Sequence, residues 1–354
     1  MSQARLRVIE GSAARADSAI DPFEYQASCL DAYVATWVAR SFSKDSITNT
    51  SGVLRRFLSA CGRPAWEVTR DDVDRVVGGL AGLGMAPSTR RGYVQAFKGF
   101  HEFLLLRKAT EIEALFGAAP VLDPIDRFNS AAHTTDLSPG ALVPPDVDRL
   151  ERFFTFLRER VGSVRKYAVA GRDYALYRTI YHAGLRAEET ASLMHSDVHF
   201  ERGPFGKLHV RNGKGARGSG PRPRFVPMLD HLDLVMTWYL ADVRPRFRDG
   251  TALFCDEGGG PISRGTIRNR LASLLAIEGG PPEERFTPHS LRRACATHNY
   301  ERGVDLVAIQ QLLGHWQIGT TMKYVSPSAT FIEDAYRRAM SATMSELEGE
   351  GDGG

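Results

Sequence analysis

The segment from Phe286 to Ser326, FTPHSLRRACATHNYERGVDLVAIQQLLGHWQIGTTMKYVS, determines how the rest of the chain is interpreted. Thr287 followed by Pro288 is typical of a helix start, because proline at the first helical position lacks a donor that would be unpaired there anyway. A second helix is predicted to begin near Asp305 and to end at Gly314. The segment therefore predicts consecutive short helices whose ends lie close to polar side chains.

The polar side chains near these helix ends are those of His289, Arg292, His315 and Tyr324. His289 and Arg292 are one turn apart on one helix face, and His315 directly follows the stop at Gly314. Thr320 or Thr321 is expected to cap a third short segment that carries Tyr324. Attack on a phosphodiester requires a nucleophile and groups that hold a phosphate and move protons. A tyrosine, two histidines and an arginine can supply these functions.

These residues resemble the tyrosine recombinase, or phage integrase, family. The motifs are His-x-x-Arg at 289–292, Leu-Gly-His at 313–315 and a tyrosine nine residues after that histidine. Upstream, AGLR at 183–186 followed by Glu189 resembles the first arginine motif of the family. NGKG at 212–215 resembles the hairpin that carries its lysine. Each motif is weak alone, and their joint occurrence in this order supports the resemblance.

The resemblance implies a DNA strand-transferring enzyme in which Tyr324 attacks a DNA phosphorus. Arg186 and Arg292 are then expected to bind the non-bridging oxygens, because guanidinium groups match phosphate geometry. The implied 3′-phosphotyrosyl link stores the energy of the broken bond, so neither ATP, a metal nor another cofactor is required. His289, His298 and His315 have no zinc-ligand spacing, which also argues against a metal site.

The remaining catalytic roles follow from the same resemblance. Lys214 is expected to protonate the leaving 5′ oxygen, His289 to assist proton transfer at the tyrosine, and His315 to bind the same phosphate. Glu189 is expected to support the site from behind. The six expected catalytic residues are Arg186, Lys214, His289, Arg292, His315 and Tyr324.

The expected fold is mainly α-helical, with a small β-hairpin or sheet in the catalytic domain. Apolar residues at helical spacing predict four helices in the first part of the chain, which resembles the core-binding domain of the family. The expected organisation is a flexible arm (1–20), a core DNA-binding helical domain (21–116), a linker (117–145), a catalytic domain (146–330), and an exchange helix with an acidic tail (331–354).

Basic residues in two places are candidates for contact with DNA phosphates, although plain solvation is the alternative for each. Residues 131–330 hold 27 Lys and Arg against 21 Asp and Glu, so the positive excess lies with the proposed chemistry. A lengthened loop, GARGSGPRP at 215–223, separates the two hairpin strands. The candidates are Arg90, Arg91 and Lys98 on the fourth helix, and Arg211, Arg217, Arg222 and Arg224 around the hairpin loop.

The expected partners are double-stranded DNA with a specific recombination site and further copies of the chain, as a tetramer on two DNA sites. Cys29, Cys61, Cys255 and Cys295 are widely spaced, which favours buried, reduced thiols in a cytoplasmic, nucleoid-associated protein. The sequence contains no run of about 18 apolar residues, so no membrane span is predicted. The short segment before the first helix favours a simpler Xer-like or mobile-element recombinase.

Three other functions remain open at this level. A type IB topoisomerase would use the same chemistry to relax a single duplex. A DNA-binding regulator could retain the fold without catalysis. A helical interaction protein is the third alternative, and the joint motifs argue against it.

Overall fold

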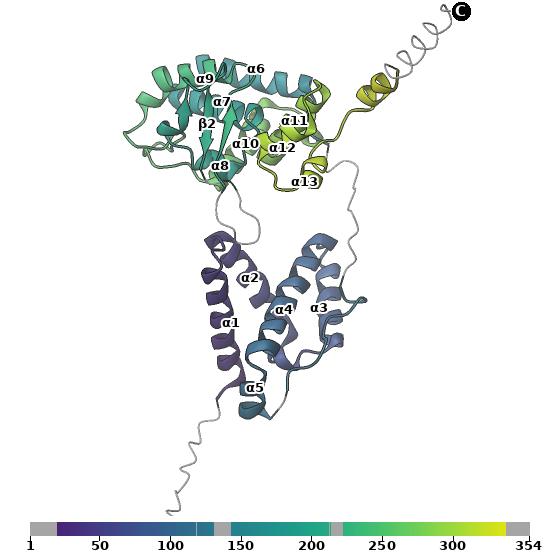
Figure 1. Ribbon diagram of the computed structural model, residues 1–354. Coiled ribbons are helices and arrows are strands. Elements are labelled where there is room, and N and C mark those ends of the chain that lie inside the picture. Colours follow the sequence, from purple (N-terminus) through teal and green to yellow (C-terminus); the bar gives the residue numbers. More distant parts are fainter. Residues whose placement is uncertain (1–19, 118, 131–142, 212, 214–221, 338–354) are drawn as a thin grey trace, which may run out of the picture. The chain divides into compact units, whose positions relative to one another are not determined.

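The computed structural model describes residues 20–117, 119–130, 143–211, 213 and 222–337. The chain divides into two compact units, residues 1–136 and 137–354, which we describe separately. Both units are mainly helical, and the described part of the second also holds a small antiparallel sheet (Figure 1). The predicted fold class is confirmed. Among the described helices, none combines the length and apolar character needed to cross a bilayer.

The first unit is a helical bundle around one aromatic core. Its described helices are α1 (Pro22–Ala39), α2 (Lys44–Cys61), α3 (Arg70–Gly82), α4 (Pro87–Arg107) and α5 (Ala109–Phe116). Phe57 and Phe97 stack at 4.8 Å between ring centroids, and both are buried. Four of these helices match the predicted ones, and α5 is an additional helix. It begins directly after Lys108 without a capping side chain, so no local signal marks its start.

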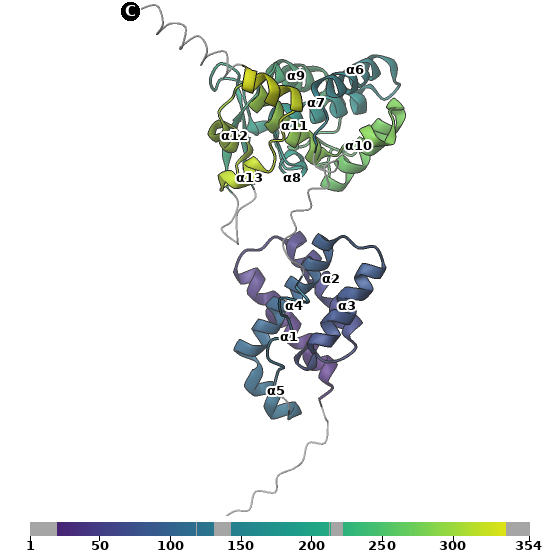
Figure 2. The same cartoon turned by 90° about the vertical axis from the view of Figure 1, so that its right-hand side faces the viewer.

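The second unit is built around α7 (Tyr167–His182), which is buried along most of its length. Its apolar residues share one core with those of the surrounding elements. The other described α-helices are α6 (Val147–Ser163), α8 (Ala187–Ala191), α9 (Leu232–Trp238), α10 (Arg264–Glu278), α11 (Pro288–Glu301), α12 (Leu306–Leu313) and α13 (Ile318–Met322). In Figure 2, α10 and α12 are seen on opposite sides of this unit, with α11 between them.

The sheet has three short strands, β1 (Val198–His199), β2 (Lys207–Val210) and β3 (Arg224–Pro227), in the order β1-β2-β3. In the β2–β3 hairpin, Lys207 is opposite Pro227 and Val210 is opposite Arg224. The hairpin predicted from the sequence is therefore present. Its tip, with Lys214 and Arg217, lies outside the described residues, so their predicted roles stay predictions.

The starts and stops of α11 and α12 follow the sequence signals. The Thr287 side chain accepts a hydrogen bond from the Ser290 amide at the start of α11, and Gly314 ends α12 with a left-handed φ of 67°. The predicted cap of the third helix is wrong. Thr320 and Thr321 lie inside α13, which begins after Gln317, so Tyr324 follows the end of this helix.

Candidate active site

The first arginine motif places Glu189 behind a group of guanidinium groups. Arg186 precedes α8, and its backbone amide and Nη1 both donate to the Glu189 carboxylate, at 2.9 and 2.7 Å. Arg224 of β3 donates from Nη1 and Nη2 to the same carboxylate, at 3.0 and 2.9 Å. Nη1 of Arg292 lies 3.5 Å from Glu189 Oε2. We call these four residues the Glu189 cluster.

The charge state of Glu189 follows from these contacts. Its side chain is only 1% exposed, and burial alone would raise the pKa of the carboxyl. The hydrogen bond and charge of Arg224 oppose burial, and so do the charges of Arg292 and Arg186. Together they lower the pKa of Glu189 to about 2. The carboxylate is therefore ionised at neutral pH, and it is surrounded by more positive charge than it can neutralise.

Arg292 is completely buried, with a side-chain exposure of 0%. It donates from Nη1 to the Gly184 carbonyl and from Nη2 to the Leu313 carbonyl, each at 2.7 Å. Gly184 has φ +59°, and a Cβ there would lie 2.7 Å from Leu313 Cδ2, so the tight turn that presents this carbonyl requires glycine. Burial and the neighbouring Arg186 lower the pKa of Arg292 to about 10, which still leaves it charged at neutral pH.

His315 contacts Arg292 directly. Its Nε2 accepts a hydrogen bond from Arg292 Nη2 at 2.9 Å, and its Nδ1 lies 2.9 Å from Thr321 Oγ1. Burial, followed by the charges of Arg292, Arg186 and Arg224, lowers the pKa of His315 to about 3. The imidazole is therefore neutral at neutral pH. Because Nε2 accepts, Nδ1 carries the proton and donates it to Thr321.

The ring of Tyr324 lies beside both predicted histidines, His289 at the start of α11 and His315 directly after the stop of α12. Its ring centroid is 5.1 Å from that of His289 and 4.7 Å from that of His315. Partial burial and the charges of Arg292, Arg293 and Arg186 lower the pKa of His289. The structure thus brings Tyr324, His289, His315, Arg292 and, through Glu189, Arg186 into one site.

Thr297 of α11 fixes the backbone around the tyrosine. Its hydroxyl donates to the Tyr324 carbonyl at 3.2 Å and accepts from the Ser326 amide at 3.1 Å. The Tyr324 amide also donates to the Thr321 carbonyl at 2.8 Å. The polypeptide that carries the tyrosine is therefore held to the helix that carries His289 and Arg292.

Some site residues were not predicted from the sequence. Thr321 orients His315, and Arg293 holds its guanidinium 5.7 Å from the centre of the Tyr324 ring while donating to Ser326. Arg293 directly follows Arg292, so its position next to a motif residue was the available signal. The pairing of Thr321 with His315 has no such signal. The two residues are six positions apart, and the start of α13 folds back to bring them together.

The predicted DNA-binding arginines of the hairpin fall into different environments. Arg211 pairs with Asp197 at 2.6 Å and donates to Ser196 at 2.8 Å. The guanidinium of Arg222 lies 4.0 Å from the centre of the exposed Trp316 ring. Arg224 belongs to the Glu189 cluster, and its side chain is 12% exposed against 39% for Arg211. In the first unit, Arg90 and Arg91 are partly buried on α4, whereas Lys98 is exposed.

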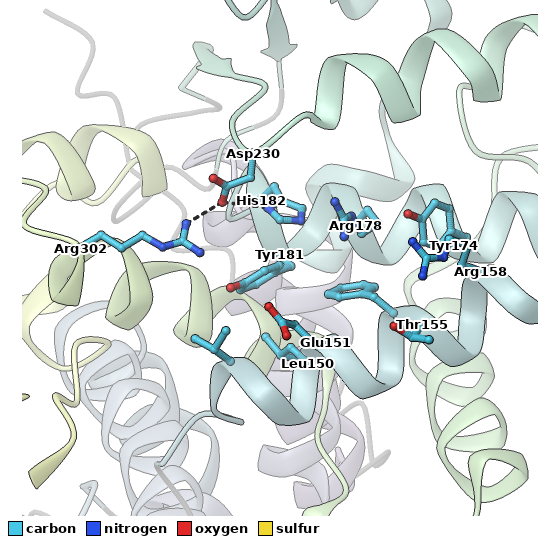
Figure 3. A pocket seen from close by; sticks show the side chains of 12 residues that line it. Leu150, Glu151, Thr155, Arg158, Tyr174, Arg178, Tyr181, His182, Asp230 and Arg302 are labelled. Carbon is cyan, nitrogen blue, oxygen red and sulfur yellow. Dashed lines mark hydrogen bonds and ion pairs between the residues drawn. The ribbon is translucent and has the colours of Figure 1, made fainter. Parts of the chain in front are cut away.

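A cavity of about 400 Å³ in the second unit is separate from these residues (Figure 3). Side chains of α6 and α7 line it, together with Asp230 and Arg302, which form an ion pair at 2.7 Å. His182 Nδ1 lies 3.2 Å from the same Asp230 carboxylate. None of the described residues expected to be catalytic lines this cavity. The candidate active site is therefore the arginine, histidine and tyrosine group, not the cavity.

A mainly helical unit that gathers two arginines, two histidines and a tyrosine, in the chain order Arg, His, Arg, His, Tyr, defines the class of tyrosine recombinases. The phage integrase family matches residues 147–330, and the chain belongs to this family. The resemblance inferred from the sequence motifs is thus confirmed.

Individual relatives agree with this assignment. The chain is 26% identical over 304 residues to the tyrosine recombinase XerD of Chlorobaculum tepidum, covering 84% of this chain and 91% of the relative. It is 33% identical over 180 residues to the tyrosine recombinase XerC of a Methylobacterium species, covering 51% and 53%. The structure of the Tn1549 transposon integrase in complex with transposon right end DNA matches with a TM-score of 0.60 at 17% identity, covering 89% and 98%. That match shows a shared fold.

Proposed function

We propose that this protein is a site-specific recombinase that cuts and rejoins double-stranded DNA through a 3′-phosphotyrosyl intermediate. The observation that carries the proposal is the position of Tyr324 against His289, His315 and Arg292. Relatives named as tyrosine recombinases, and a fold shared with an integrase solved in complex with DNA, support it. The activity requires residues 146–330 as the catalytic domain and residues 21–116 as a second DNA-binding domain.

The chemistry begins with attack of the Tyr324 hydroxyl oxygen on a DNA phosphorus. The new Tyr324–phosphorus bond forms as the bond from phosphorus to the 5′ oxygen breaks. His289 takes the tyrosine proton, and its lowered pKa keeps it neutral and able to accept. Lys214, from the hairpin tip, gives a proton to the leaving 5′ oxygen. Attack by a 5′ hydroxyl of a partner strand reverses these steps, so no ATP or metal is needed.

The phosphate is held by Arg186 and Arg292, whose positive charge exceeds what Glu189 neutralises. Each guanidinium can offer paired N–H donors to the non-bridging oxygens, where charge develops in the transition state. For His315 to donate to the same phosphate, its proton must move from Nδ1 to Nε2, and Nε2 must give up the hydrogen bond that it accepts from Arg292. The hydroxyl of Thr321 can then donate to Nδ1, since a hydroxyl both donates and accepts.

A tetramer on two DNA sites would use the C-terminal segment as a contact between copies. Phe331 lies 5.7 Å from Tyr300 of its own chain, whereas Ile332 and Tyr336 are exposed on the helical residues 329–337. Truncation after Ser328 should preserve binding to one site but weaken cooperative binding and strand exchange, measured by gel shifts on one-site and two-site DNA. Unchanged cooperativity and exchange would rule out this role.

Tyr324→Phe tests the chemistry, because it removes only the nucleophilic oxygen. The expected result is loss of the covalent protein–DNA band on a nicked suicide substrate, seen by denaturing electrophoresis, with DNA binding retained. A persistent band would place the nucleophile elsewhere, with Tyr300 the next candidate. Relaxation of a supercoiled plasmid that lacks a recombination site would instead indicate the topoisomerase activity left open by the sequence.

A further inference from the structure

Arg224 differs from Arg211 and Arg222, the other described basic residues around the hairpin loop, in what its guanidinium group binds. It is the first residue of β3 and lies opposite Val210 of β2. Its side chain is 12% exposed, half of the 24% of Arg186. Both terminal nitrogens donate to Glu189, and Nε donates to the Leu312 carbonyl at 3.1 Å. Every guanidinium nitrogen of Arg224 is therefore engaged within the protein.

The contact with Leu312 ties Arg224 to the turn before His315. Gly314 has φ +67°, and a Cβ on it would lie 2.9 Å from Arg224 Cδ and 3.0 Å from Nε. The arginine stem thus packs against the backbone of this turn. Arg224 and Arg292 bind the adjacent carbonyls of Leu312 and Leu313 at the end of α12. A helix C-terminus is the favourable end for a positive charge.

The paired contact with Glu189 also determines how charge is distributed in the Glu189 cluster. Nη1 and Nη2 of Arg224 each donate to a different oxygen of the carboxylate, which is the strong bidentate geometry of an arginine–carboxylate pair. It therefore neutralises Glu189, and the charges of Arg186 and Arg292 remain available to an anion. Without Arg224, the carboxylate would hold Arg186 more tightly, draw Arg292 closer than its present 3.5 Å, and compete with a bound phosphate for both.

We propose that Arg224 is a positioning residue for the phosphate-binding arginines and His315, and not a ligand of DNA phosphates. The proposal rests on the proposed recombinase function. It predicts that loss of Arg224 slows the chemical step and leaves DNA affinity intact. It further predicts that the damage comes from Glu189 once its neutralising partner is gone.

The experiment compares Arg224→Ala, Arg224→Lys and the double variant Arg224→Ala with Glu189→Gln in the full chain. Single-turnover cleavage of a nicked suicide substrate is measured at saturating protein, and the Kd for the same DNA is measured against salt concentration. We expect Arg224→Ala to cleave about 100-fold more slowly, the effect of a small misplacement of catalytic groups. We expect its Kd and its salt slope to match those of the unchanged protein.

The other two variants separate neutralisation from simple packing. Arg224→Lys keeps the charge but loses the paired geometry, so its cleavage rate should fall between those of the unchanged protein and Arg224→Ala. The double variant should recover about 10-fold of the rate lost in Arg224→Ala, because a neutral amide no longer competes with phosphate. Circular dichroism and thermal unfolding check that each variant is folded, and Arg224→Lys provides the test if Arg224→Ala does not fold.

Two results would overturn the proposal while leaving the proposed function intact. One is a salt slope smaller by about one in Arg224→Ala, as expected for a lost phosphate contact. The other is an unchanged cleavage rate in both Arg224→Ala and Arg224→Lys. Failure of the unchanged protein to form a covalent complex would be a different result, because it would overturn the recombinase function together with this inference.

Discussion

In the described part of the second unit, two buried carboxylates, Asp173 and Glu189, each pair with more than one arginine, and only Glu189 lies at the candidate active site. Asp173 of α7, with a side chain 2% exposed, binds Arg172 at 2.7 Å and Arg270 at 2.7 Å. Arg172 also donates to the Cys255 carbonyl at 3.0 Å. We call these three residues the Asp173 cluster. The Glu189 cluster has the same chemistry, equally well buried, but a third arginine.

The difference between the clusters is the charge that remains after pairing. One carboxylate and two arginines leave one excess positive charge, whereas one carboxylate and three arginines leave two. The Glu189 cluster also adjoins His315 and Tyr324. Tyr177, which lies near the Asp173 cluster, instead donates its hydroxyl to the Ile267 carbonyl inside the core. A buried ion pair alone therefore does not mark an active site. The Glu189 cluster differs because its excess positive charge lies beside the Tyr324 side chain, which carries the proposed nucleophile.

The largest expected effect separates chemistry from stability. Arg292→Lys keeps a positive charge but cannot make the several directed contacts of the guanidinium, so cleavage should fall by about 100- to 1000-fold. Arg172→Lys, the matched change in the Asp173 cluster, should instead lower the free energy of unfolding, by about 3 kcal/mol for a damaged buried pair. Single-turnover cleavage and urea unfolding measure the two effects. Equal losses of cleavage in the two folded variants would remove the distinction.

Glu189→Gln should lower stability and also change its dependence on pH. At neutral pH we expect a loss of about 3 kcal/mol, because three arginines lose their buried partner. A carboxyl with a lowered pKa stabilises the fold above its ordinary value of 4.5, and this contribution is lost as the pH falls toward about 2. The stability difference between the unchanged protein and Glu189→Gln should therefore shrink below pH 4.5. Urea unfolding at several pH values measures it, and a constant difference would contradict the assignment.

The smallest expected effect concerns His315, which adjoins the Glu189 cluster through Arg292. The lowered pKa of His315, about 3 against an ordinary 6.5, means that the fold favours the neutral imidazole. Its contribution to stability is present above pH 6.5 and declines as the pH falls toward 3, by at most about 1.4 kcal/mol per pH unit. Unfolding of His315→Gln should lack this slope between pH 6.5 and 5. An identical slope in both proteins would mean that His315 is already charged in the fold.

The parts of the site that sequence could predict are those fixed by local chemistry. The caps of α11 and the glycine stop of α12 depend on neighbouring residues, and they place His289, Arg292 and His315 correctly at helix ends. The first turn of α13 was misplaced, because threonines can cap a helix or lie within one. The sequence predicted that Glu189 supports the site from behind, but it did not predict that Arg186, Arg224 and Arg292 are its partners.

Contacts between distant segments explain what was missed. Arg224 donates to Leu312 across 88 residues and to Glu189 across 35, and nothing local distinguishes it from the other arginines of its loop. Helix α5 was missed although Ile112, Leu115 and Phe116 have helical spacing, because it has only eight residues and no capping side chain marks its start. The role of Lys214 stays a prediction from the motif.

The hydroxyl of Thr297 has a consequence for how subunits would share work. It donates to the Tyr324 carbonyl and accepts from the Ser326 amide, so the nucleophile is tethered to the helix that carries His289 and Arg292. Each copy of the protein then holds its own nucleophile together with its own activating side chains. Under the proposed function, every subunit of an assembly cuts the strand on which it sits. A copy with Tyr324→Phe and a copy with Arg292→Lys would have no complete site to form between them, and mixing the two would not restore cleavage.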